Sequence, residues 1–391
     1  MLFRSFSIAT YLAIKEIWRN RGRFLLVAMV IALITLLVLF IAALGEGLGN
    51  GNREYLSKLD SELIVFQAKS DNVVAASRLG RDRLAAVRRV DGVADAAVFG
   101  SSSASIILPN GVEPLKIALL GVEPGRTGEP TVEQGRQLST NLASEVIMDS
   151  NTAIRSGLQV DDIVTIRVTQ GTRDEFFDLR IVGVTDGQQF QLQPTIFVPF
   201  FTWDRIRPKS EAEVNSLTSV GNVILVKLEN PAELEVVSQR ITNQVDNVET
   251  ATLKETIQAL PGYSAQQSTL QTQGGFTLFI GILVIGGFFQ IQILQKVSQI
   301  GVLKAICAAN PVVALSAIIQ IVLITVIGVF IGALFTFSFS LFFPPTVPIV
   351  FNGTTSAIAI IALLLIGPLG GLVSIRYAVR IEPLKALGLS S

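Results

Sequence analysis

Four long runs of uncharged, mainly apolar residues constrain this chain more than any other feature of its sequence. None of the four contains Asp, Glu, Lys or Arg; they cover residues 24–44, 274–294, 311–343 and 354–374. An α-helix rises 1.5 Å per residue, so ~20 apolar residues cross a hydrocarbon core of ~30 Å. We therefore predict four transmembrane helices, at 24–45, 274–295, 311–343 and 354–374. The third run is long enough to tilt or to project beyond the bilayer.

The first run also resembles a secretory signal peptide, because basic residues precede it. Its 21 residues exceed the apolar core of such a signal, which is typically about 7–15 residues long. We interpret it as an uncleaved anchor.

Basic residues predict the orientation of the four helices. The segments 1–23, 296–310 and 375–391 together contain ten Lys and Arg residues against two acids, Glu16 and Glu382. Short loops rich in Lys and Arg stay on the cytoplasmic side. We therefore expect both termini and the 296–310 loop to be cytoplasmic, 1–23 to form an amphipathic helix, and 46–273 to lie outside the cell membrane.

The large insert between the first and second apolar runs is predicted to be an α+β domain. Strand-like segments are expected at 63–66, 105–108, 115–120, 163–168, 177–184 and 223–228, with a hairpin turn at Asn110-Gly111. Helices are expected at 81–90 and 231–245, and polar helical stalks at 46–59 and 253–273. The predicted fold is thus an α-helical membrane protein with one helix, an extracytoplasmic α+β domain, and three further helices.

Composition excludes several classes of function. The chain has no histidine, and its single cysteine, Cys307, cannot form an intrachain disulfide. There is no Gly-Lys-Ser/Thr nucleotide-binding motif, and 31 basic residues balance 31 acidic ones, which gives no basic surface for nucleic acid. We expect no catalytic residue, no metal site and no cofactor in this chain. A further hypothesis is a membrane-embedded hydrolase. The sequence counts against it, because the chain has no histidine and the four apolar runs contain no acidic residue.

Three polar clusters in the insert are candidate binding sites: the first for anionic lipid or substrate, the second for a divalent ion and the third for a peptide backbone. Each is interpreted as ordinary surface. Arginines at 78, 81, 83, 88 and 89 would form a solvated helix face. The acids at 161, 162, 174 and 175 lie at turns, and the glutamines at 188, 189, 191 and 193 would form a solvated loop.

Pairs of glycines mark the third and fourth apolar runs. Gly328 and Gly332 form one Gly-x-x-x-Gly pair, and Gly367 and Gly371 form another. Small residues at this spacing let helices approach closely in lipid, so we expect these four to be packing sites.

The loop at 296–310 carries apolar residues at helical spacing, and here the sequence resembles a known family. Gln299–Ala308 resembles the "R-E-I-G-hydrophobic-L-K/R-A-hydrophobic-G-A" segment of FtsX-like permeases, the family of the MacB-type exporters and the lipoprotein-releasing permeases. Residues 12–20 resemble its N-terminal "L-A-x-R-N-L-x-R-N" helix and 376–387 its "A-x-R-x-x-P-x-x-A-L" tail. Residues 157–164 resemble its "G-L-x-V-G-D-x-V" motif, with Asp161 where Gly is usual.

The resemblance implies the membrane subunit of an ATP-binding-cassette system in the cell membrane. A dimer of such chains would work with separate ATPase subunits, which would bind ATP and Mg²⁺. Membrane lipids and a periplasmic adaptor would be further partners, and the output would be export, lipoprotein release or control of a wall enzyme. The coupling helix would contact the ATPase through Gln299, Ile300, Gly301, Val302, Leu303, Lys304 and Ala305. Ser298-Gln299 stands where the family has Arg-Glu, and Cys307 stands where the family commonly has Gly. Binding to the ATPase would therefore depend on apolar packing and on Lys304.

A different class of function stays open from sequence alone. The chain would then be a membrane-anchored sensor, or a regulator of cell-wall enzymes, whose outer domain binds a signal. The short segments predicted to be cytoplasmic contain no signalling domain, which counts against this alternative.

Overall fold

The computed structural model describes residues 2–108, 113–214, 219–298, 302, 310–343, 347 and 349–380. The chain divides into two compact units, which are described separately. Residues 1–48 and 267–391 form the helical unit, and residues 49–266 form the α/β unit. Two long helices begin in one unit and end in the other.

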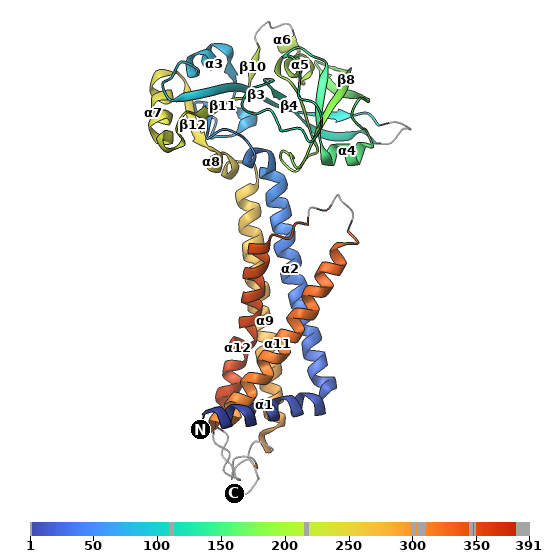
Figure 1. Ribbon diagram of the computed structural model, residues 1–391, viewed down its shortest axis with the longest axis vertical. Coiled ribbons are helices and arrows are strands. Elements are labelled where there is room, and N and C mark those ends of the chain that lie inside the picture. The colour runs from blue at the N-terminus through green and yellow to red at the C-terminus, as the bar shows by residue number, and fades with distance from the viewer. Residues whose placement is uncertain are drawn as a thin grey trace. The chain divides into compact units, whose positions relative to one another are not determined.

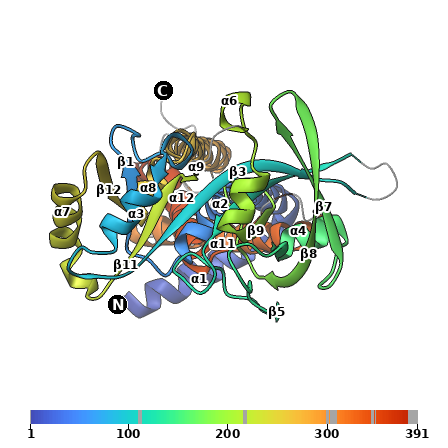
Figure 2. The same cartoon turned by 90° about the horizontal axis from the view of Figure 1, so that it is seen from above.

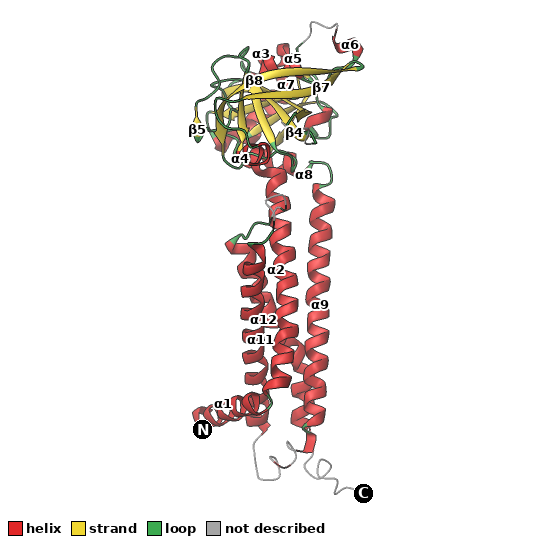
Figure 3. Ribbon diagram, turned by 90° about the vertical axis from the view of Figure 1, so that its right-hand side faces the viewer, coloured by secondary structure: helices red, strands yellow, loops and turns green. Residues whose placement is uncertain are grey.

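The helical unit is built from long helices (Figures 1 and 3), and these helices share an apolar core. The described helices are α1 (Leu2–Arg19), α2 (Arg21–Ser57), α9 (Tyr263–Gln295), α11 (Asn310–Ser340) and α12 (Gly353–Arg380). Four of them, α2, α9, α11 and α12, are long and apolar enough to cross a membrane. The chain is therefore a membrane protein with four apolar helices.

The core of this unit receives side chains from all four apolar helices. Phe24 and Ile31 of α2, Ile285 of α9, Ile321 of α11 and Leu363 of α12 are each buried there. The short helix α1 lies crosswise at one end of the unit (Figure 1) and is separated from α2 by a single turn residue at position 20.

The α/β unit is organised around one large mixed sheet. Its strands and those of a small second sheet are β1 (Leu63–Gln67), β2 (Leu79–Gly80), β3 (Val93–Ile106), β4 (Leu115–Val122), β5 (Gln134–Gly135), β6 (Glu145–Asp149), β7 (Ile163–Gln170), β8 (Arg173–Thr185), β9 (Thr195–Pro199), β10 (Val220–Gly221), β11 (Val223–Leu228) and β12 (Val248–Thr252). The large sheet has the order β12-β1-β11-β3-β4-β9-β6-β8-β5, and β7 pairs with β3 and β8. Strands β10 and β2 pair separately.

The long strand β3 joins the two halves of the sheet (Figure 2). Its first half, to Phe99, pairs with β11, and its second half, from Gly100, pairs with β4. The short helices of this unit are η1 (Val74–Ala76), α3 (Arg81–Val87), α4 (Ser150–Ser156), α5 (Phe200–Ile206), α6 (Glu211–Val214), η3 (Pro231–Glu233), α7 (Leu234–Gln244) and α8 (Leu253–Gln258).

Both faces of the sheet are covered at strands such as β1, which explains their continuous apolar runs. In β1, Leu63 and Val65 belong to one buried cluster, while Ile64 and Phe66 belong to the other. A strand with one face in water would alternate apolar and polar residues, whereas a strand buried on both faces does not. The run at 63–66 is a strand of the second kind.

Several expected elements differ in the structure. The strand expected at 105–108 is only the end of β3, which begins at Val93 and ends at Ile106. The stalk expected at 253–273 is interrupted, because α8 ends at Gln258 and α9 begins only at Tyr263; Pro261 and Gly262, whose φ is +77°, lie between them. The helix expected at 81–90 ends at Val87. The antiparallel pairing of β3 with β4 follows the expected hairpin, although its Asn110-Gly111 turn lies outside the described residues.

Candidate functional site

The last turns of α2 carry the candidate site, because this helix ends inside the core of the α/β unit. Tyr55 and Leu56 are 2% and 1% exposed. The Tyr55 ring lies 5.2 Å from the ring of Phe197 and 5.6 Å from that of Phe99, centroid to centroid, and its hydroxyl donates to the carbonyl of Gly128 at 2.9 Å. The end of α2 is thus held by aromatic packing and by a buried hydrogen bond. We call this group, with Phe190, the helix anchor.

A loop between β8 and β9 closes over the same helix end. The Leu192 amide donates to the carbonyl of Gly51 at 3.0 Å, and the Tyr55 amide donates to that of Gln189 at 3.1 Å. The Lys58 ammonium donates to the carbonyls of Gly187 and Asp186, at 2.7 and 3.0 Å. These bonds tie the backbone of the loop to the backbone and side chains of the helix.

The loop is itself held by Asp149, a residue that sequence reasoning missed. The carboxylate of Asp149 accepts hydrogen bonds from the backbone amides of Gln188, at 2.9 Å, and Asn151, at 3.2 Å. Burial removes water from this carboxylate and raises the pKa of Asp149. Gln188 is 6% exposed, so the interpretation of this loop as solvated is wrong for that residue. For the helix anchor a sequence signal was available, because Tyr55-Leu56 is an apolar pair in a mainly polar predicted stalk.

The start of α9 reaches the same core. Leu260 is buried beside the helix anchor cluster, and Tyr263 packs partly against it. The side-chain amide of Asn52 donates to that of Gln266 at 3.3 Å, which links α2 to α9. Both long helices therefore meet the α/β core at neighbouring points.

The acidic and basic clusters of the insert have partners within the protein. Asp161 lies 3.0 Å from Arg180, and Asp174 accepts a hydrogen bond from the Thr169 hydroxyl at 2.9 Å. Among the arginines, Arg88 pairs with Glu123 at 2.6 Å. Within the described ranges no group of three or more Cys, Asp or Glu side chains is arranged to hold a metal ion.

The first glycine pair lies on α11 against α2. A Cβ added at Gly328 would lie 2.6 Å from Cβ of Ile31, and one added at Gly332 would lie 2.5 Å from the carbonyl oxygen of Ala32. These contacts leave no room for a larger residue. The two helices approach closely along this face.

The second pair lies on α12 against α11. A Cβ added at Gly367 would meet Thr325, and one added at Gly371 would meet Ile321. A third close approach lies between α9 and α12, where the backbones of Gly286 and Gly370 come together. That all four predicted glycines are required for packing stays a prediction.

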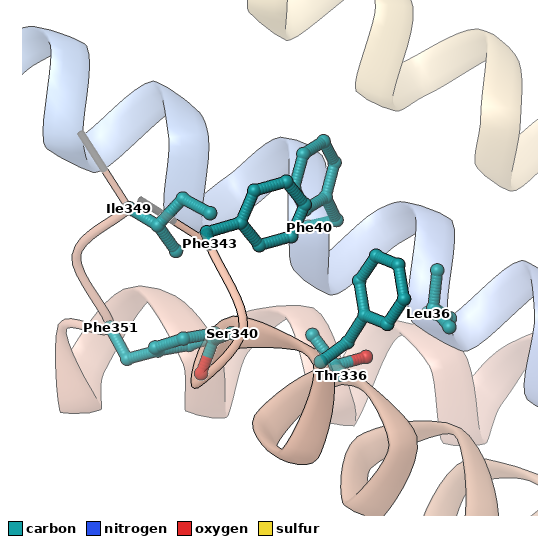
Figure 4. A pocket seen from close by; sticks show the side chains of 8 residues that line it. Leu36, Phe40, Thr336, Ser340, Phe343, Ile349 and Phe351 are labelled. Carbon is teal, nitrogen blue, oxygen red and sulfur yellow. The ribbon is translucent and has the colours of Figure 1, made fainter. Parts of the chain in front are cut away.

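A small pocket opens between α2, α11 and the chain that follows α11 (Figure 4). Its lining is apolar and aromatic, and consists of Leu36, Phe40, Thr336, Phe339, Ser340, Phe343, Ile349 and Phe351. The hydroxyl of Thr336 donates to the carbonyl of Gly332 within its own helix. The pocket therefore offers no charged group to a ligand.

Most of the predicted coupling residues cannot be placed. Val302 is described, in helical conformation and 47% exposed. Gln299, Ile300, Gly301, Leu303, Lys304, Ala305 and Cys307 lie outside the described residues. Their contact with an ATPase stays a prediction.

The sequence matches two family models that together span both units. Residues 24–244 match the MacB-like periplasmic core domain, and residues 274–383 match the C-terminal region of FtsX-like permeases. The chain belongs to the MacB/FtsX-like permease family. This permease is thus a membrane subunit of an ABC transporter, a class that normally works with an ATPase subunit.

Curated relatives match the permease over almost its whole length. One from Staphylococcus epidermidis, named as a hemin transport system permease protein, HrtB, is 25% identical over 377 residues, which cover 96% of this chain and 99% of the relative. Another protein of that name, from Staphylococcus haemolyticus, is 22% identical over 379 residues, with the same coverage.

Solved structures resemble part of the permease. The extracellular domain of the transporter YknZ from Gram-positive bacteria aligns with a TM-score of 0.36 and 15% identity, covering 48% of this chain and 98% of that one. The periplasmic region of MacB from Actinobacillus actinomycetemcomitans aligns with a TM-score of 0.36 and 12% identity, covering 51% and 91%.

Proposed function

We propose that this permease couples ATP hydrolysis by a separate ATPase subunit to motion of its α/β domain. The observation that carries the proposal is the continuity of α2. One uninterrupted helix runs from Arg21, through the apolar run at 24–44, to Ser57, and Tyr55 near its end is buried in the helix anchor. Because a helix is stiff, a change in its tilt is passed along its length to the group that holds its end.

The partners follow from the family and from the charges. Two copies of the chain would work with two ATPase subunits that bind ATP and Mg²⁺, and residues 296–310 would be the coupling helix. Ten basic residues against two acids in the short segments support a cytoplasmic position for that helix and for both termini. A periplasmic adaptor would be an additional partner.

Two buried threonines of α11 favour motion over conduction. The hydroxyls of Thr325 and Thr336 donate to the carbonyls of Ile321 and Gly332 in their own helix, each at 2.8 Å. A hydrophilic path would need side chains that present such groups to a pore. The helices would therefore transmit movement, in the manner of a two-state element, without carrying a substrate between them.

For the output we propose export of an amphiphilic compound from the membrane or its outer leaflet. Hemin is the first compound to test, because it stands in the names of the full-length relatives. Since the chain has no histidine, any protein ligand to the iron would be another residue type, such as Tyr or Met.

The decisive experiment combines partner binding with immobilised helix ends. The native chain is co-expressed with an ATPase encoded beside it, and Leu303→Asp should abolish co-purification, because an unpaired carboxylate on an apolar contact lowers affinity by roughly 10²-fold or more. In a Cys307→Ser background, cysteines at Asn52 and Gln266 are then joined by a short thiol crosslinker. Joined helices should stop the cellular output, measured as hemin tolerance, while ATP hydrolysis persists.

Two results would contradict the proposal. If no ATPase associates with the native chain, the result favours the alternative that the chain is a membrane-anchored sensor. If the crosslinked protein keeps full output, motion of α2 against α9 is not the mechanism.

A further inference from the structure

The short helix α1 turns one face toward α11, and its acid lies on that face. Ala9 and Ala13 are fully buried, and Glu16 follows at the same helical spacing, i, i+4 and i+7. Glu16 is the only acidic residue among residues 1–45, where five basic residues accumulate. Lys and Arg set the orientation of the protein and an acid contributes little to it, so Glu16 needs a separate explanation.

Each carboxylate oxygen of Glu16 receives a donor from a different helix. The Lys296 ammonium, one residue beyond the end of α9, lies 2.5 Å from Oε1. The Gln320 side-chain amide, on α11, donates to Oε2 at 2.6 Å. The Glu16 and Lys296 side chains are only 27% and 17% exposed, and Gln320 is 7% exposed. Glu16 thus bridges the end of α9 to α11.

Further contacts hold the same end of α9. The Arg23 guanidinium donates to the side-chain oxygen of Gln295 at 2.8 Å, and the Lys296 ammonium lies 5.3 Å from the centroid of the Phe24 ring. These contacts join α9 to the start of α2, whereas among the described residues of this cluster it is Glu16 that joins α9 to α11.

The bridge connects the two helices that flank the predicted coupling segment. Lys296 opens the 296–310 segment, and α11 begins at Asn310, where that segment closes. We propose that Glu16 is a positioning residue, which holds the two helices flanking the coupling segment at a fixed mutual orientation so that movement of the segment reaches both. This inference rests on the proposed function and adds α1 to the coupling machinery.

The chemistry requires a carboxylate. Two oxygens accept from two donors at once, whereas the glutamine amide has a single acceptor oxygen. Hydrogen bonds to charged groups are the stronger ones. Glu16→Gln keeps size and shape, and a turned Gln320 amide can still pair with it, but the variant removes the negative charge that faces the Lys296 ammonium.

The test measures coupling separately from binding. The reporter is the ATP-dependent change in crosslinking between cysteines at Asn52 and Gln266, in the Cys307→Ser background and in complex with the ATPase. Glu16→Gln should lower this change by about tenfold, as for a lost hydrogen bond to a charged group, while ATPase co-purification and ATP hydrolysis stay within about twofold. Gln320→Leu, which suits an apolar helix and still inserts, should act in the same direction.

A charge swap and a matched control make the role specific. Glu16→Lys combined with Lys296→Glu restores the ion pair with the net charge unchanged, and the Gln320 amide can turn its oxygen toward the new lysine. The swap should restore the crosslinking response. Lys15→Gln, which also removes one charge from α1 but at an exposed position, should leave it at the native level.

The outcomes separate this inference from the function beneath it. A native response in Glu16→Gln, or a defect that the swap does not correct, would overturn the role of Glu16 alone. Failure of the native chain to bind an ATPase would overturn the proposed function itself.

Discussion

At the scale of single residues, two carboxylates of the α/β unit show opposite responses to their surroundings. Glu145 accepts hydrogen bonds from Arg136, at 2.5 Å, and from the Ser139 amide, at 2.9 Å, and the Arg136 bond is the main cause that lowers the pKa of Glu145 to about 2. No cationic side chain among the described residues pairs with Asp149, and burial raises the pKa of its carboxyl group. Position alone, not residue type, decides between the two.

Glu145→Gln should destabilise the protein in a pH-dependent way. Since the folded pKa of Glu145 lies below its ordinary value of 4.5, its ionised form stabilises the folded state above about pH 4.5, and this contribution is lost as pH falls through about 2. We expect the melting temperature of the detergent-solubilised protein to drop by about 2–6 °C at pH 7, with the difference from native shrinking below pH 4.

A matched control uses an exposed pair. Asp161 and Arg180 have side chains 74% and 63% exposed, so Asp161→Asn should change the melting temperature by less than the error of the measurement. Asparagine also tolerates the φ of +76° at this position, where the related motif usually has Gly. An equal drop in melting temperature for the two variants would show that the Glu145–Arg136 contact stabilises the protein no more than an exposed ion pair does.

At the scale of elements, close approach between helices depends on missing side chains. Gly332→Ala should separate α11 from α2, because the new Cβ would lie 2.5 Å from a backbone oxygen that cannot turn away. Overpacking of this kind costs about 1–3 kcal/mol. The thermal unfolding of the purified protein in detergent measures it.

Gly287→Ala is the control for the same substitution. This glycine lies within α9, and an added Cβ would meet nothing within 4 Å. Alanine favours a helix over glycine by roughly 0.5–1 kcal/mol, so the variant should be as stable as the native chain or more stable. If Gly332→Ala behaves like Gly287→Ala, the α2–α11 contact is looser than the structure has it.

At the scale of the whole molecule, the orientation across the membrane is the first property to test. Single cysteines in the Cys307→Ser background belong at Thr172, an exposed turn residue between β7 and β8, and at Lys15, exposed on α1. An impermeant thiol reagent should label Thr172→Cys in intact cells and Lys15→Cys only after lysis. The reverse pattern would invert the topology.

The sequence by itself determined the features that follow from local pattern. Uncharged runs of membrane length have one physical solution, so the four apolar helices could be predicted from 24–44 and its three counterparts. Alternation and turn residues likewise predicted β7 and β8, and motif order along the chain predicted the family.

Only the tertiary structure decided which distant residues meet. Nothing local to Tyr55 shows that its ring packs on Phe99 and Phe197. Likewise, Glu16 and its partner Lys296 lie 280 residues apart in the sequence. Such contacts depend on how whole elements pack, which periodicity does not encode. The break before Tyr263 is of the other kind, because Pro261-Gly262 is a local turn signal from which it can be predicted, and the packing of Leu260 in the core agrees with that signal.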